Sequence, residues 1–107
     1  MNFTISLGTG NLQEFSIVNA SSWSNCLAYC EGTGLQINSI QFIPNSIIVH
    51  NTETTNCFQV LAKSSEGTNT NYLVWENTFD DLTTWINSQS FQSVLSIQLS
   101  NKSYVVV

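Results

Sequence analysis

The sequence predicts an α+β fold built from tandem duplicated ββαββ units with pseudo-two-fold symmetry, mostly antiparallel sheets and one short helix per unit. Three observations support this prediction. Several segments alternate apolar and polar residues as strands do, two segments carry helix-capping signals, and the two halves of the 107-residue chain resemble each other. Since a chain of this length has room for one compact domain, we expect both units to share it.

The resemblance between the halves covers the predicted elements in the same order. Residues 34–50 align with residues 91–107, and "SWSNCLAYC" aligns with "TFDDLTTWI". The conserved order favours a duplication over chance similarity between polar segments. The predicted organisation is a first unit at 1–50, a linker at 51–56 and a second unit at 57–107. The aligned pairs include Phe3 with Phe58, Trp23 with Phe79, Cys26 with Leu82, Cys30 with Ile86, Ile40 with Ile97 and Phe42 with Leu99.

In the first unit, two strands come before a helix and two follow it. "NFTISL" alternates, "GTGN" turns the chain, and "EFSIV" is the second expected strand. Ser22 is the expected N-cap of a helix through Glu31, and Gly32 occupies the position of a C-cap glycine. "LQINSIQFI" and "SIIVH" are then expected to form a hairpin around the Pro44-Asn45 turn.

The second unit repeats this plan. "CFQVLA" and "YLVWE" are the expected strands before its helix, and "KSSEGTNTN" is the loop that joins them. Thr78 is the expected N-cap, Asp81 completes a capping box, and Asp80 and Asp81 suit the positive end of the helix dipole. We therefore expect this acidic pair to be structural, and we expect a last hairpin to turn at "SNK". Such short helices are not stable alone, so both must pack on the sheets.

The composition excludes several classes of partner. Only 8% of the residues are charged, the formal net charge is −5, and the only basic residues are Lys63 and Lys102. Nucleic acids and anionic membranes need clustered cations, so we expect neither as a partner. The N-terminal "MNFTISLGTG" has no basic segment followed by an apolar one, so we expect no signal peptide. The expected location is a virion or the cytoplasm of the producing cell.

Zinc favours cysteine and histidine ligands, and the chain has four such residues. They are Cys26, Cys30, His50 and Cys57. The repeat argues against a zinc site, because Cys26 and Cys30 align with Leu82 and Ile86, and buried free cysteine behaves as a small hydrophobic residue. We therefore expect core packing at these positions, without a metal or another cofactor.

The sequence also lacks a convincing catalytic set. A Cys-His pair would have to use His50, the only histidine, which aligns with the strand-end residue Val107. The acidic residues are scattered along the chain, whereas glycoside hydrolysis needs two carboxylates that converge. We therefore expect a protein without enzymatic activity.

Two apolar runs exceed what the predicted fold requires. "SIIVH" and "SYVVV" are apolar on both faces, whereas a strand with one solvated face alternates. One face can lie under a helix, and the other must meet the sister unit or another protein. The candidate partner interface is therefore Ile47, Ile48, Val49, Tyr104, Val105, Val106 and Val107.

These features predict a non-enzymatic structural or assembly protein that binds protein partners, either a capsid or further copies of itself. Its low charge and its abundance of Ser, Thr and Asn favour a small bacteriophage virion protein, such as a capsid decoration or accessory head protein. The alternative is a small-molecule- or peptide-binding module or inhibitor that uses a groove between the two units. Aromatic residues could line such a groove, namely Trp23, Trp75, Trp85, Phe91 and Tyr104.

Overall fold

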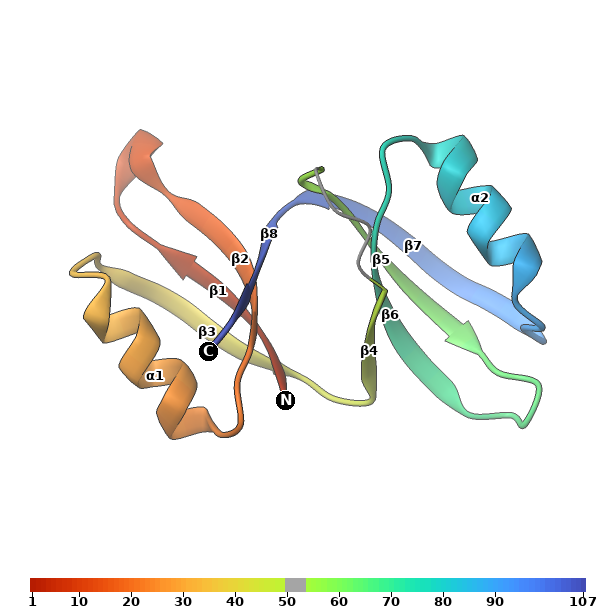
Figure 1. Cartoon of the computed structure of the whole chain (residues 1–107), viewed down its shortest axis with the longest axis horizontal. Coiled ribbons are helices and arrows are strands. Elements are labelled where there is room, and N and C mark those ends of the chain that lie inside the picture. The colour runs from red at the N-terminus through yellow and green to blue at the C-terminus, as the bar shows by residue number, and fades with distance from the viewer. Residues whose placement is uncertain (50–53) are drawn as a thin grey trace. The chain divides into compact units, whose positions relative to one another are not determined.

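The computed structural model describes residues 1–49 and 54–107, which form two compact units. Unit 1 comprises residues 1–44 and 102–107, and unit 2 comprises residues 45–101. Each unit contains one α-helix and one four-stranded sheet, so the predicted α+β class is confirmed (Figure 1).

In unit 1, helix α1 packs on one face of a sheet with the strand order β3-β1-β2-β8. Cys26 and Cys30 of the helix are fully buried among apolar side chains of β1 and β2. Neighbouring strands are antiparallel except for β2 and β8, which run parallel. The elements are β1 (Asn2–Leu7), the short 3-10 helix η1 (Gly10–Leu12), β2 (Glu14–Asn19), α1 (Trp23–Gly32), β3 (Ile37–Ile43) and β8 (Ser103–Val106).

In unit 2, helix α2 packs on a sheet with the strand order β4-β6-β5-β7. Leu82 of the helix is buried against Phe58 and Val60 of β5 and Val74 of β6. Only β4 and β6 run parallel among the neighbouring strands described here. The elements are β4 (Ser46–Val49), β5 (Asn56–Lys63), β6 (Asn69–Trp75), α2 (Phe79–Ser88) and β7 (Ser93–Asn101).

The two sheets place corresponding elements in corresponding positions. In unit 1, β1 lies between β2, which precedes the helix, and β3, which follows it; in unit 2, β5 lies in the same way between β6 and β7. Phe3 of β1 faces Phe42 of β3, and Phe58 of β5 faces Leu99 of β7. The register of each pairing also shifts at one place, between Ser6 and Leu7 in unit 1 and between Leu61 and Ala62 in unit 2.

The prediction that each unit ends in a hairpin is wrong. β3 and β4 belong to different sheets, and so do β7 and β8. Instead β4 pairs with β6 and β8 pairs with β2, so each sheet is completed by a strand from the other half of the sequence. The Pro44-Asn45 signal indicates a change of chain direction, but it carries no information about which strand the next segment will pair with.

The strand exchange also changes the boundaries of the compact units. The chain passes from unit 1 to unit 2 after Pro44 and returns after Asn101. These boundaries differ from the predicted segments 1–50 and 57–107. Within the predicted linker 51–56, residues 51–53 lie outside the described residues.

Both helices begin where the sequence predicted. The side chain of the N-cap Ser22 accepts a hydrogen bond from the Asn25 N–H at 3.1 Å, and Thr78 accepts one from the Asp81 N–H at the same distance. The end of α1 differs from the prediction, because Gly32 is its last residue and Thr33 is the C-cap. Thr33 donates two hydrogen bonds to the Cys30 carbonyl oxygen, one from its N–H at 3.3 Å and one from its hydroxyl at 2.7 Å.

Candidate functional site

The predicted interface residues are divided between the two units. Residues 47–49 lie in β4 at one edge of the unit 2 sheet. Residues 104–106 lie in β8 at one edge of the unit 1 sheet, and Val107 follows them. The sheet pairings therefore do not join the two runs to each other.

Each apolar run contributes to a core as well as to the surface. Val49 packs against the core of unit 2, and Val105 packs against the core of unit 1. In contrast, Ile47 is 50% exposed, Val106 is 66% exposed and Val107 is 43% exposed. Each run therefore contributes a residue to a core, and each also presents large apolar side chains at the surface.

The edge strands of both sheets carry no charged residue. These strands are β3 and β8 in unit 1 and β4 and β7 in unit 2. Their sequences are INSIQFI, SYVV, SIIV and SVLSIQLSN, which contain no Lys, Arg, Asp, Glu or Pro. The charged residues that do lie in described strands are Glu14 and Lys63, and both belong to inner strands. Charge and proline are two common devices that keep sheet edges from pairing with another chain, and these edges have neither.

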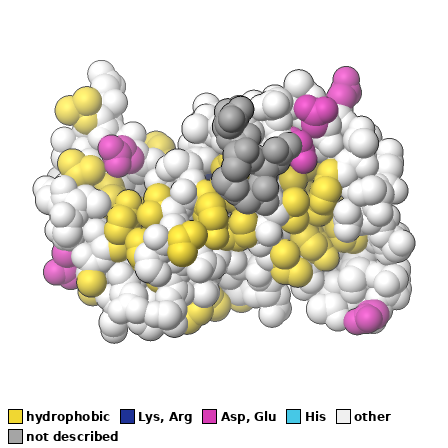
Figure 2. All heavy atoms as spheres, viewed as in Figure 1, with side chains coloured by type: hydrophobic (Ala, Val, Ile, Leu, Met, Phe, Trp, Pro, Cys, Tyr) yellow, Lys and Arg dark blue, Asp and Glu magenta, His cyan; other side chains and the backbone are white. Residues whose placement is uncertain are grey.

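Strand β7 carries more exposed large apolar side chains than any other described strand. Val94, Leu95, Ile97 and Leu99 are between 37% and 59% exposed. Hydrophobic side chains also reach the surface over much of the face drawn in Figure 2, where the visible charged groups are few and acidic. The sequence predicts a strand at β7 but does not mark it as an interface, because its alternating pattern is the one expected of an ordinary strand with one face under a helix.

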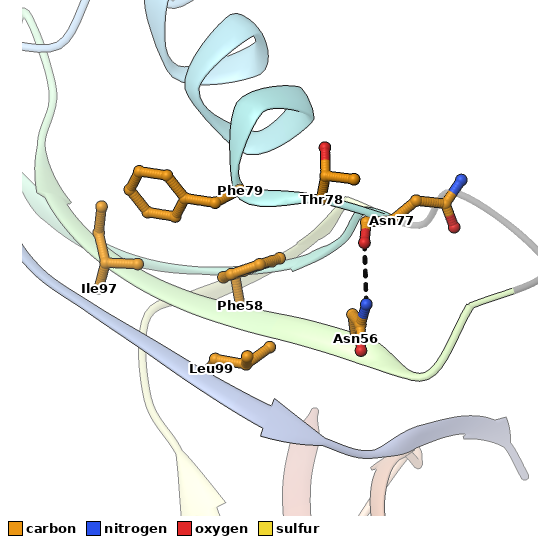
Figure 3. A pocket seen from close by; sticks show the side chains of 7 residues that line it. All are labelled: Asn56, Phe58, Asn77, Thr78, Phe79, Ile97 and Leu99. Atoms are coloured by element: carbon orange, nitrogen blue, oxygen red, sulfur yellow. Dashed lines mark hydrogen bonds between the residues drawn. The ribbon is translucent and has the colours of Figure 1, made fainter.

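Two of these exposed side chains, Ile97 and Leu99, border a pocket of about 400 Å³ within unit 2. Phe79 enters it from the first turn of α2, Phe58 from β5, and Ile97 and Leu99 from β7 (Figure 3). Phe58 is almost fully buried, whereas Phe79 and Leu99 are more than half exposed. The floor and sides of the pocket are therefore apolar.

The polar rim of this pocket is uncharged. It consists of Asn56, Asn77 and Thr78. The Asn56 side chain donates a hydrogen bond to the Asn77 carbonyl oxygen at 2.9 Å, which ties the start of β5 to the segment before α2 (Figure 3). The Thr78 hydroxyl oxygen accepts the Asp81 N–H, and its own hydrogen remains a donor. Such a pocket can hold an apolar group and offer hydrogen bonds at its mouth, but it has no charge to pair with an ionic ligand.

The cysteines have the environment of core residues, as predicted. Cys26, Cys30 and Cys57 are free thiols, and each is at most 1% exposed. Burial, followed by the neighbouring Cys30, raises the pKa of Cys26 to about 11. Burial also raises the pKa of Cys30, although its hydrogen bond with Cys26 opposes the shift. Since the thiolate is the reactive form, these thiols are poor nucleophiles at neutral pH.

The described residues contain no group of three or more His, Cys, Asp or Glu side chains placed to hold a metal ion. His50, the histidine of the four-residue zinc candidate, lies outside the described residues. No described helix has both the length and the apolar character needed to cross a membrane.

The geometry therefore identifies two surface features, the uncharged sheet edges and the apolar pocket beside α2. Comparisons of the chain with models of known protein families, with curated proteins and with solved structures find no match.

Proposed function

We propose that this is a non-enzymatic structural or assembly protein that pairs and packs its sheet edges against other protein subunits. The observation that carries this proposal is the absence of charge and proline from all four edge strands of the described sheets. Edges without charge or proline favour the addition of a strand from another chain. Exposed apolar side chains on the same strands would be covered in such a complex, and large exposed apolar surfaces usually mark interaction sites.

The longest edge strand, β7, is the proposed centre of the interface. It spans nine residues and carries four of the exposed apolar side chains. The predicted interface residues at 47–49 and 104–107 lie on other sheet edges, where Ile47, Val106 and Val107 offer further exposed apolar side chains to partners. With only 8% charged residues in the chain, binding should depend on shape and burial and respond little to salt.

We further propose that the assembly is a virus particle, in which the protein is a phage capsid decoration or accessory head protein. The support is compositional: a surface protein of a particle needs hydrogen-bonding groups and a matching shape rather than titrating residues. Quantitative mass spectrometry of gradient-purified particles tests this proposal directly. We expect a fixed number of copies per particle, and absence from particles despite abundance in the lysate would contradict it.

Substitutions on β7 test the association itself. The double substitution Ser96→Lys and Gln98→Lys adds two charges to exposed positions of the edge strand. We expect wild-type protein to associate in sedimentation velocity as concentration rises, or to co-sediment with particles, and we expect the variant to lose this association. Asn87→Lys adds charge at an exposed position of α2 and is the matched control, which should behave as wild type. A wild-type chain that stays monomeric at every concentration and does not bind particles would refute the proposal.

We also propose that the two units arose by duplication of one ββαββ segment. The equal strand orders, the matching registers and the paired register shifts support this history. An experimental structure tests it by superposition of residues 2–43 on residues 57–100. A match of every element in order is expected, and a different strand order in the two halves would contradict the duplication.

A further inference from the structure

At the position in unit 1 that corresponds to the pocket of unit 2, aromatic rings of the chain itself pack against one another. There the ring of Phe3 packs against Trp23, with centroids 5.9 Å apart, and against Phe42, with centroids 5.6 Å apart. Trp23 is the first residue of α1, and Phe42 faces Phe3 across the sheet. Three rings from three elements therefore meet at the start of the helix in unit 1.

Unit 2 has smaller side chains at two of these three positions. Phe58 takes the place of Phe3, but the first residue of α2 is Phe79, and the residue that faces Phe58 is Leu99. The indole ring of unit 1 is replaced by a phenyl ring, and its second phenyl ring is replaced by an isobutyl group. Phe58 and Phe79 still pack at a centroid distance of 6.3 Å, and the pocket opens beside them.

We infer that the unit 2 pocket binds a small, uncharged aromatic molecule. Its ring occupies the place that the Phe42 ring fills in unit 1, against Phe58 and Phe79. Aromatic rings in tilted or edge-to-face contact attract each other beyond the effect of buried area, and both phenylalanines present such surfaces. The pocket volume of about 400 Å³ falls within the range of about 300–1,000 Å³ that is typical of small-molecule sites.

The surroundings of the pocket select most strongly against anionic ligands. None of its lining residues is basic, so an anionic ligand has no partner there. Asp80 and Asp81 in the first turn of α2 add negative charge nearby, which further disfavours an anion. The Asn and Thr groups at the rim can hydrogen-bond to one hydroxyl, amide or ring N–H of a neutral ligand. This site lies within unit 2 and shares Ile97 and Leu99 with β7, the proposed centre of the interface.

Indole is a suitable probe, because it is neutral, aromatic and carries one N–H donor. In two-dimensional ¹H–¹⁵N NMR of the full chain, titration with indole should shift the resonances of Phe58, Thr78 and Phe79 and leave those of Phe3 and Trp23 in place. The variant Leu99→Phe gives unit 2 the ring that unit 1 has, and it should lose these shifts. Leu99 is 59% exposed, so the larger ring can be accommodated and the fold should be retained in circular dichroism.

A reciprocal variant provides the matched control. Trp23→Phe combined with Phe42→Leu gives unit 1 the residues of unit 2, and it should add a second set of indole-induced shifts around Phe3. The inference is overturned if indole causes no shift in wild-type unit 2 up to its solubility limit. It is equally overturned if folded Leu99→Phe protein binds indole as tightly as wild type.

Discussion

Replacing Gly8 with alanine should strongly destabilise unit 1. Gly8 has φ = +99°, and a Cβ atom added there would lie 2.3 Å from the Leu12 carbonyl oxygen. Its next neighbours, at 3.1 and 3.3 Å, are also backbone atoms, of Leu12 and Gln13, so a rotamer change cannot relieve the contact. The turn between β1 and β2 would have to move.

The same turn is fixed from the side of β3. The Gly8 N–H donates a hydrogen bond to the Gln36 carbonyl oxygen at 2.7 Å, and the Gly8 carbonyl oxygen accepts one from the Asn38 side chain at 2.7 Å. Backbone strain at such a φ costs about 1–3 kcal/mol, and forced overpacking costs about 1–3 kcal/mol more. We therefore expect Gly8→Ala to lower the free energy of unfolding by about 2–6 kcal/mol, a large part of the stability of a small domain.

Urea denaturation monitored by circular dichroism and by tryptophan fluorescence measures this loss, and Trp23 is the only tryptophan in unit 1. Gly10→Ala is the control for strain without a clash, because Gly10 has φ = +56° and no atom within 4 Å of the added Cβ. Gly10→Ala should lower the free energy of unfolding by about 1–2 kcal/mol. If the two variants lost the same stability to within about 0.5 kcal/mol, the argument from the Leu12 contact would fail.

Three further predictions concern the helices. Cys26→Ala and Cys30→Ala should each cost about 1–2 kcal/mol in urea denaturation through lost packing, and unfolding of the wild type by a chelator alone would contradict this interpretation. Because folding raises the pKa of Cys26 from an ordinary value of 9.0 to about 11, the protonated thiol stabilises the fold fully below pH 9, and this contribution is lost as the pH rises towards 11. Wild type should therefore lose more stability than Cys26→Ala across this range in a series of urea titrations, and equal losses would argue against it. Ser22→Ala and Thr78→Ala should each cost about 1 kcal/mol in thermal denaturation by removing an N-cap, whereas Ser24→Ala, at an exposed position of α1, should stay within about 0.5 kcal/mol of wild type.

Elements that depend on local chemistry could be predicted from the sequence. The helices begin after Ser22 and Thr78 because a side-chain oxygen three residues before a backbone N–H satisfies it, and this information lies within one turn. The burial of Cys26 could also be predicted, since it aligns with Leu82, and both are fully buried.

Strand partners could not be predicted in the same way. The four residues of β4 follow β3 after only Pro44 and Asn45, a spacing that suits a hairpin as well as an exchange between sheets. Which pairing forms depends on the free edge that β6 offers, and this edge is set by residues distant in the sequence. The pocket was missed for a related reason. The alignment paired Phe42 with Leu99, and the leucine side chain is the smaller of the two. This difference indicates a pocket only once the sheet register is known, because the register places each residue opposite a buried phenylalanine.

The exchanged strands connect the proposed duplication with the proposed assembly role. In a single ancestral ββαββ segment, the last strand could not fold back on its own sheet. The edge of the second strand would then be unpaired, at the position that β8 and β4 occupy in this chain. A second copy could fill that edge with its own last strand, so the simplest ancestor is a dimer that exchanges strands. Joining two such copies in one chain makes the exchange intramolecular. The outer edges β3 and β7 are untouched by this fusion, and their lack of charge leaves them open to the proposed contact with further subunits.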